Sequence, residues 1–298
     1  MNAIEVKNLR KLYKDTVAVD DISFEVREGE LFALLGENGA GKSTTINMLC
    51  TILEKTSGEA SVYGHVLGKE DGAIREAIGI VFQNSVLDAK LTVKENLYLR
   101  GAFYGLTKKE IEERLKNFDS HFEVEGIWNR RYETLSGGQR RRVDIMRALI
   151  HKPRILFLDE PTTGLDPKSR QLVWDYINHL RKDNGMTIFL TTHYMEETKD
   201  ADHVVILDKG KIITQGTPIE LKTKYTSSKL IWYTPEKEEA EAILKDFRHT
   251  YDADHYNVYF DGSITEFLYE HRDTIVDFEI NKGTMDEVFL TLTGKELQ

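Results

Sequence analysis

The chain has 298 residues, of which 40% are hydrophobic and 30% are charged. That length suits about two domains, and the composition excludes a mainly disordered chain. The 40 Lys and Arg residues against 50 Asp and Glu leave a net charge of −10, which argues against a nucleic-acid-binding protein that works by phosphate neutralisation.

The longest apolar run, residues 31–35, is far shorter than the roughly 20 residues that a membrane-spanning helix needs. The N-terminal residues contain no apolar stretch of signal-peptide length. A single cysteine, Cys50, excludes an internal disulfide and a cysteine-based zinc site. We therefore expect a soluble cytosolic protein of two domains.

Short apolar runs alternate with amphipathic segments, which is typical of an α/β protein. Residues 3–7 and 17–26 alternate in polarity and predict an antiparallel β lobe. Further strands are expected at residues 31–35, 78–82, 155–158, 187–191, 204–207 and 212–215. Helices are expected at residues 42–53, 92–104, 108–118, 135–151 and 168–183.

Small polar residues interrupt this pattern at 223–229 and predict a domain boundary after residue 222. The remaining residues, 223–298, predict strands at 229–233, 255–260 and 275–280, and helices at 236–247, 263–271 and 284–293. We therefore expect a small C-terminal α/β domain, which carries no recognisable chemical motif.

A glycine-rich segment follows the strand 31–35 and opens a predicted helix. Its residues are Gly36, Glu37, Asn38, Gly39, Ala40, Gly41, Lys42, Ser43 and Thr44. The glycines permit a loop whose N–H groups converge on phosphate, Lys42 adds a mobile positive charge, and the Ser43 hydroxyl suits Mg²⁺. A simple strand-to-helix turn is the alternative, but the pattern and its context favour a nucleotide-binding phosphate loop (P-loop).

The apolar strand 155–158 ends in two acids, Asp159 and Glu160. Ligands of open α/β sheets lie beyond the carboxyl ends of the strands, so Asp159 is a candidate Mg²⁺ ligand and Glu160 is a candidate to polarise the attacking water. A turn-forming acid pair is the alternative. Gln83 follows another strand in the same way and is a candidate to contact Mg²⁺ or water, although a surface polar residue fits its position equally well. His193 follows a further strand and is a candidate to hydrogen-bond the γ-phosphate or the attacking water; for an isolated histidine, a solvated loop residue is the more usual interpretation.

A second glycine-containing corner lies at Leu135-Ser-Gly-Gly-Gln139, before the predicted helix. Ser136, Gly137, Gly138 and Gln139 predict another anion-binding helix start, one without its own lysine. Such a corner makes sense if it faces the phosphates held by another copy of the chain. The adjacent run Arg140–Arg142 is expected to be mainly a solvated face.

Together these motifs resemble the ATP-binding subunit of an ATP-binding cassette (ABC) transporter, over residues 1 to about 222. Residues 36–44 resemble the Walker A loop, Gln83 the Q-loop, residues 135–139 the signature, and residues 155–159 Walker B with Glu160 as the catalytic acid. The resemblance further implies that Tyr13 stacks on adenine, that Asp166 belongs to the D-loop and that His193 is the switch histidine.

The resemblance implies a P-loop NTPase fold with an antiparallel β lobe and a helical subdomain at about residues 84–150. It also implies ATP and Mg²⁺ as cofactors. A second nucleotide-binding subunit is expected, so that a homodimer closes head to tail over ATP. A separate transmembrane permease is expected as well, with this chain located peripherally on the inner face of the membrane. Nucleic acid is not an expected partner.

Three stretches resemble bacterial ABC-2-type export ATPases for drugs, sodium or antibiotic peptides: residues 83–88, 192–198 and 283–294. Residues 129–134 lack the Gly- and Glu-rich pattern of fused multidrug exporters. Export of a drug, antibiotic peptide, lipid or ion is therefore expected. A soluble ABC ATPase without a permease, for example one in cluster assembly, is the alternative, whereas a non-hydrolysing regulatory module conflicts with the presence of Glu160 and His193.

Overall fold

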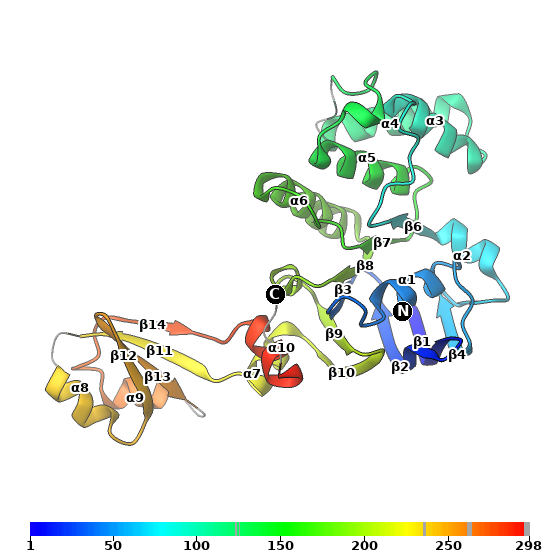
Figure 1. The fold of residues 1–298 in the computed structure, drawn as a ribbon. Coiled ribbons are helices and arrows are strands. Elements are labelled where there is room, and N and C mark those ends of the chain that lie inside the picture. Colours follow the sequence, from blue (N-terminus) through cyan, green and yellow to red (C-terminus); the bar gives the residue numbers. More distant parts are fainter. Residues whose placement is uncertain (123, 125, 235–236, 261–263, 295–298) are drawn as a thin grey trace. The chain divides into compact units, whose positions relative to one another are not determined.

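The computed structural model describes residues 1–122, 124, 126–234, 237–260 and 264–294. The chain divides into two compact units, residues 1–215 and 216–298 (Figure 1). The boundary expected after residue 222 lies inside α7 (Pro218–Tyr225), a helix that belongs wholly to the second unit. In the part of the chain that is described, no helix is long and apolar enough to cross a membrane.

The first unit contains two sheets. The first sheet has the order β2-β1-β4-β5, and the pairings of β1 with β2 and β4, and of β4 with β5, are antiparallel. Its strands are β1 (Asn2–Tyr13), β2 (Thr16–Arg27), β4 (Ser57–Val62) and β5 (His65–Val66). The expected antiparallel lobe is confirmed, but sequence reasoning missed β4 and β5. The β4 sequence, SGEASV, has weak strand propensity and becomes a strand through its pairing with β1.

The second sheet has the order β10-β9-β3-β8-β7-β6. Its strands are β3 (Leu31–Gly36), β6 (Ile78–Val81), β7 (Ile155–Asp159), β8 (Thr187–Thr192), β9 (His203–Asp208) and β10 (Lys211–Gly216). β3, β7 and β8 are buried at every position and pair in parallel, as expected for apolar runs without polar alternation.

The α-helices that the structure describes in the first unit are α1 (Lys42–Leu49), α2 (Asp71–Ala77), α3 (Val93–Phe103), α4 (Lys108–Phe122), α5 (Gly137–Leu149) and α6 (Pro167–Asn184). Sequence reasoning missed α2 and extended α1 to residue 53. The helix ends at Leu49 because Thr51 has a left-handed backbone, with φ +61°. α3 packs against α4 and α5, which gives the expected helical subdomain.

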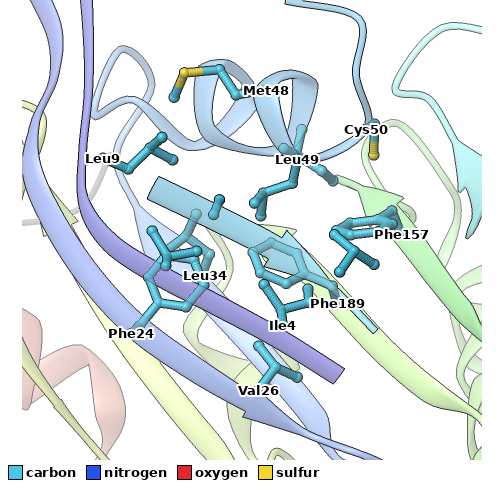
Figure 2. Close-up of a cluster of buried hydrophobic side chains, with 14 of the residues drawn as sticks. Ile4, Leu9, Phe24, Val26, Leu34, Met48, Leu49, Cys50, Phe157 and Phe189 are labelled. Carbon is cyan, nitrogen blue, oxygen red and sulfur yellow. The ribbon is translucent and has the colours of Figure 1, made fainter. Parts of the chain in front are cut away.

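One hydrophobic core joins the antiparallel lobe, α1 and the parallel sheet (Figure 2). Phe189 lies at its centre, with ring centroids 4.9 Å from Phe32 and 5.2 Å from Phe157. Met48 and Leu49 contribute from α1. Burial of a large apolar side chain contributes about 1.5–3 kcal/mol, so this core fixes α1, and hence the loop before it, on the sheet.

The second unit contains a four-stranded antiparallel sheet with the order β12-β13-β11-β14. Its elements in chain order are α7, β11 (Ser228–Tyr233), α8 (Lys237–Leu244), β12 (Arg248–Asp252), β13 (His255–Phe260), α9 (Ile264–Glu270), β14 (Phe278–Asn281) and α10 (Met285–Thr293). This β-α-β-β-α-β order is the ferredoxin-like arrangement.

The expected C-terminal α/β unit is thereby present, although α7 and β12 were missed and β14 begins three residues later than predicted. The predicted helices 236–247 and 263–271 begin at residues 236 and 263, and these two residues lie outside the described part of the chain. The unit has its own core, in which Trp232 and Tyr256 are fully buried. A compact unit with a separate core is what a domain requires.

Candidate active site

The parallel pairing brings four sequence motifs to one edge of the sheet. Leu35 at the end of β3 pairs with Thr192 in β8, Asp159 in β7 pairs with Thr191, and Val81 in β6 pairs with Leu158. The residues that follow these strand ends therefore emerge side by side. They are the phosphate loop from Gly36, His193, Glu160 and Gln83.

Glycine is required at two points of the phosphate loop. A Cβ atom on Gly36 would lie 2.5 Å from the carbonyl oxygen of Leu207. Gly41, at the start of α1, has φ +105°, and a Cβ there would lie 2.5 Å from the carbonyl oxygen of Ala18. The loop thus lies too close to neighbouring backbone for any side chain at these positions. Asn38 and Gly39, at its tip, are exposed.

Polar side chains from separate segments of the chain converge on the buried carboxylate of Glu160, which is 7% exposed. Lys42 Nζ lies 3.4 Å from Glu160 Oε1, and His193 Nδ1 lies 3.2 Å from the same oxygen. Gln83 Nε2 and Thr163 Oγ1 each donate a hydrogen bond of 3.2 Å to Glu160 Oε2. The His193 contact is close but lacks the alignment of a hydrogen bond.

The Lys42 ammonium lies over its own loop. Its Nζ donates to the carbonyl oxygens of Gly36, at 2.8 Å, and Glu37, at 3.0 Å. Loss of solvation lowers the pKa of Lys42, and the neighbouring Glu160 carboxylate opposes that shift. The lysine is 4% exposed, so its charge acts in a weakly screened environment where an anion is attracted strongly.

A hydroxyl and a carboxylate adjoin this cluster. Ser43 Oγ donates to Asp159 Oδ1 at 3.3 Å, and Thr191 Oγ1 donates to the same oxygen at 2.5 Å. One carboxylate and one hydroxyl are a donor set that fits Mg²⁺, which keeps most of its waters and takes few protein ligands.

The signature residues form the start of α5 and lie outside the Glu160 contacts. Ser136 Oγ accepts from the Gln139 N–H at 3.3 Å, and Gln139 Oε1 accepts from the Ser136 N–H at 3.1 Å. This capping box leaves Ser136 and Gly137 exposed at a helix N-terminus, where free N–H groups and the helix dipole attract anions.

Tyr13 and Asp166 also lie apart from the Glu160 cluster. The Tyr13 side chain is 44% exposed, with Lys11 Nζ 5.0 Å from its ring centroid. Asp166 caps α6 and accepts from Ser169 N at 3.0 Å and Ser169 Oγ at 2.6 Å. These hydrogen bonds lower the pKa of Asp166. An exposed aromatic ring is available to a planar ligand, whereas the Asp166 carboxylate is committed to its helix.

Sequence reasoning missed Thr163 and Thr191, and it was wrong about Arg141, which was expected on a solvated face. Arg141 is only 6% exposed. The burial of Arg141 could have been predicted from its position along the helix, because Arg141 shares one face of α5 with Ile145 and Ala148, which are both buried.

Comparison with known proteins identifies the family. Residues 19–163 match the ABC transporter family model. The chain is 37% identical to the daunorubicin/doxorubicin resistance ATP-binding protein DrrA of Streptomyces peucetius, over 98% of this chain and 92% of that protein. It is 34% identical to the linearmycin resistance ATP-binding protein LnrL of Bacillus subtilis, over 99% of each.

Solved structures agree. CbiO1 of Clostridium perfringens, part of the ABC transporter complex cbiONQ, has a TM-score of 0.68 and 30% identity, over 82% of this chain and 94% of that chain. The ATP-binding cassette MJ0796, in a dimeric post-hydrolysis state bound to ADP and Pi, has a TM-score of 0.66 and 28% identity, over 72% and 98%. The chain therefore belongs to the ABC transporter family, as an ATP-binding subunit that hydrolyses ATP.

Proposed function

We propose that the cluster around Glu160 is the ATP-hydrolysing centre, and that the chain drives export through a separate membrane permease. The observation that carries the catalytic assignment is the convergence of Lys42, Gln83 and His193 on one buried carboxylate beside the phosphate loop. Phosphoryl transfer depends mainly on positioning and charge neutralisation, and this arrangement provides both.

Each residue then has a distinct task. The loop N–H groups and the Lys42 ammonium bind the phosphates. Ser43 and Asp159 hold Mg²⁺, which when bound neutralises phosphate charge. The Glu160 carboxylate orients the attacking water and accepts its proton. Gln83 holds that carboxylate by a hydrogen bond and contacts Mg²⁺ or the water, and His193 contacts the water or the γ-phosphate. Tyr13 stacks on the adenine ring.

We further propose that two copies close head to tail, so that Ser136, Gly137 and Gly138 of one copy contact the nucleotide held by the other. Two features support this: the exposed helix start at Ser136 lies outside the Glu160 cluster, and the similar cassette MJ0796 forms a dimer. Asp166 joins this dimer contact through its loop backbone, because its carboxylate caps α6.

The export assignment rests on relatives that align along nearly the whole chain, DrrA and LnrL, both named as resistance ATP-binding proteins. We propose a hydrophobic drug or antibiotic as the cargo and the inner membrane face as the location. The alignment with DrrA includes the second unit, residues 216–298, which we propose as a regulatory or dimer-contact domain. These full-length relatives favour export over a permease-free ATPase.

The test is the Glu160→Gln substitution, which keeps the shape of the side chain and removes its charge. Turnover of ATP should fall by at least about 100-fold, the usual contribution of a general base, while the Kd for ATP stays near the wild-type value. The variant should accumulate as an ATP-bound dimer on size exclusion. Glu196→Gln, the same change at an exposed position, is the matched control. Full steady-state activity in the Glu160 variant contradicts the assignment.

The export step has its own test. If a membrane permease is encoded beside this chain, the two proteins together in lipid vesicles should hydrolyse ATP faster than the chain alone and should move a fluorescent anthracycline across the membrane. Equal ATPase activity with and without any such permease would favour the permease-free alternative.

A further inference from the structure

Arg141, on α5 two residues after the signature, donates to four backbone carbonyls on two separate strand ends. Its Nε donates to Pro161 O at 2.5 Å, and its Nη1 donates to Phe82 O at 2.5 Å. Its Nη2 donates to Asp159 O at 3.2 Å and Glu160 O at 3.0 Å. One guanidinium therefore joins the ends of β6 and β7 to the signature helix.

Among the described residues, the hydrogen-bond acceptors of this buried charge are neutral carbonyl groups, which compensate poorly for its loss of solvation. Loss of solvation lowers the pKa of Arg141, and nearby acids, Asp144 first, oppose that effect. The Asp144 carboxylate accepts from Ser85 Oγ at 2.6 Å and from Tyr132 OH at 3.0 Å. Apolar residues of similar size often stabilise such sites as well or better, so stability alone gives a weak reason for an arginine here.

The accepting carbonyls lie where they control the catalytic side chains. Phe82 directly precedes Gln83. The carbonyls of Asp159 and Glu160 belong to the two peptide groups that flank the Glu160 Cα atom, and the Pro161 carbonyl belongs to the next peptide group. Glu160 has φ +47°, a left-handed backbone that L-residues rarely adopt. Such a conformation persists only when its surroundings over-determine it, and the planar fork of Arg141 supplies two hydrogen bonds to this turn and a third to Pro161.

We propose that Arg141 is a positioning residue for ATP hydrolysis: from the signature helix it holds the backbone that aims Glu160 and Gln83 at the attacking water. Arg141 itself touches neither nucleotide nor water in this role. The inference rests on the proposed function, because it assumes that Glu160 is the carboxylate that activates water. It predicts a loss in turnover that is transmitted through Glu160.

The first experiment is Arg141→Lys in the full chain. Lysine keeps the charge, but its single ammonium cannot reach acceptors on two strand ends in the geometry of the fork. Because a misplacement of about 1 Å can cost about 100-fold in rate, kcat should fall by roughly 10- to 100-fold. The Kd for ATP, measured directly, should stay within about threefold, since no phosphate-loop contact changes. Arg140→Lys, the same change at the adjacent exposed arginine, is the control and should retain wild-type kcat.

A double-variant cycle separates positioning from general damage. If Arg141 acts through the Glu160 carboxylate, adding Arg141→Lys to Glu160→Gln should cause little further loss of residual turnover. Chemical rescue gives a second readout: ethylguanidinium should restore part of the kcat of Arg141→Ala, and ethylammonium should not. Rescue also shows that the Ala variant is folded.

The outcomes are distinct. Three results would overturn the positioning role. The first is a kcat for Arg141→Lys within twofold of wild type, and the second is a loss of ATP binding as large as the loss of kcat. The third is the same proportional loss of turnover in the wild-type and Glu160→Gln backgrounds. Full turnover by Glu160→Gln alone overturns the proposed function instead, whatever Arg141 does.

Discussion

The two signature glycines, Gly137 and Gly138, lie in different surroundings. Replacing each by alanine is therefore predicted to change the stability of the protein in opposite directions. A Cβ atom on Gly138 would lie 2.4 Å from Ser169 Oγ and 2.8 Å from Ser169 Cβ, at the start of α6. A Cβ on Gly137 would meet only Leu165 Cδ2, at an ordinary 3.5 Å. Neither glycine has a positive φ, so backbone strain does not enter the comparison.

The magnitude for Gly138→Ala follows from these contacts. Rotation of the Ser169 side chain moves Oγ but leaves Cβ in place, so the first turn of α6 must shift. Overpacking of this kind costs about 1–3 kcal/mol. If the Ser169 hydroxyl also loses its hydrogen bond to Asp166, about 0.5–1.5 kcal/mol more is lost. The higher helix propensity of alanine returns up to about 1 kcal/mol. With each of these contributions near the middle of its range, the net loss is about 1–3 kcal/mol, against a gain of about 0–1 kcal/mol for Gly137→Ala.

Calorimetry of the full chain measures this difference in stability between the two variants, from the thermal unfolding transition of the first unit. At about 2–4 °C per kcal/mol for a unit of this size, Gly138→Ala should lower Tm by roughly 2–12 °C, whereas Gly137→Ala should leave it unchanged or raise it. In a Ser169→Gly background, which removes both clashing atoms, Gly138→Ala should cost almost nothing. Equal Tm changes for the two glycine variants, or an undiminished cost in the Ser169→Gly background, would refute the reasoning.

Three further predictions concern binding, assembly and pH. Lys42→Ala should weaken ATP binding at least about tenfold in a direct assay, because a charge-assisted phosphate contact is lost; wild-type affinity would contradict this role. Ser136→Arg in the Glu160→Gln background should bind ATP but fail to dimerise on size exclusion, and a persisting dimer would contradict the head-to-tail arrangement. Burial lowers the pKa of His151 to about 4, below the unperturbed value of about 6.5. The unfolded chain therefore takes up this proton first, and stability should fall as pH drops from about 6.5 to about 4; the fall in Tm between pH 7 and pH 5 should be smaller for His151→Phe than for wild type.

Motifs on parallel strands were predictable because the strand ends determine where their side chains go. Gly36, Gln83, Glu160 and His193 each follow an apolar run, and parallel pairing leaves one edge at which such residues can emerge. The strands that were missed owe their conformation to pairing. β4 has little intrinsic preference for a strand and pairs with β1, which lies much earlier in the chain, whereas the exposed strand β12 forms a hairpin with β13 directly after it.

The role of a side chain that forms hydrogen bonds with the main chain was much harder to predict. A pattern of residue types shows which groups can do chemistry, and so Glu160 was predicted as a candidate because it is an acid at a strand end. Arg141 forms its hydrogen bonds with carbonyl oxygens, which every residue carries, and nothing in the residue types at 82, 159, 160 or 161 marks them as acceptors. Only the tertiary arrangement of α5 against β6 and β7 reveals them. The arginine run after the signature therefore contains two kinds of residue. Arg140 is exposed, and we expect lysine to replace it without loss of turnover. Arg141 is buried, and its planar guanidinium reaches acceptors on two strand ends, which is why its exchange for lysine is the informative substitution.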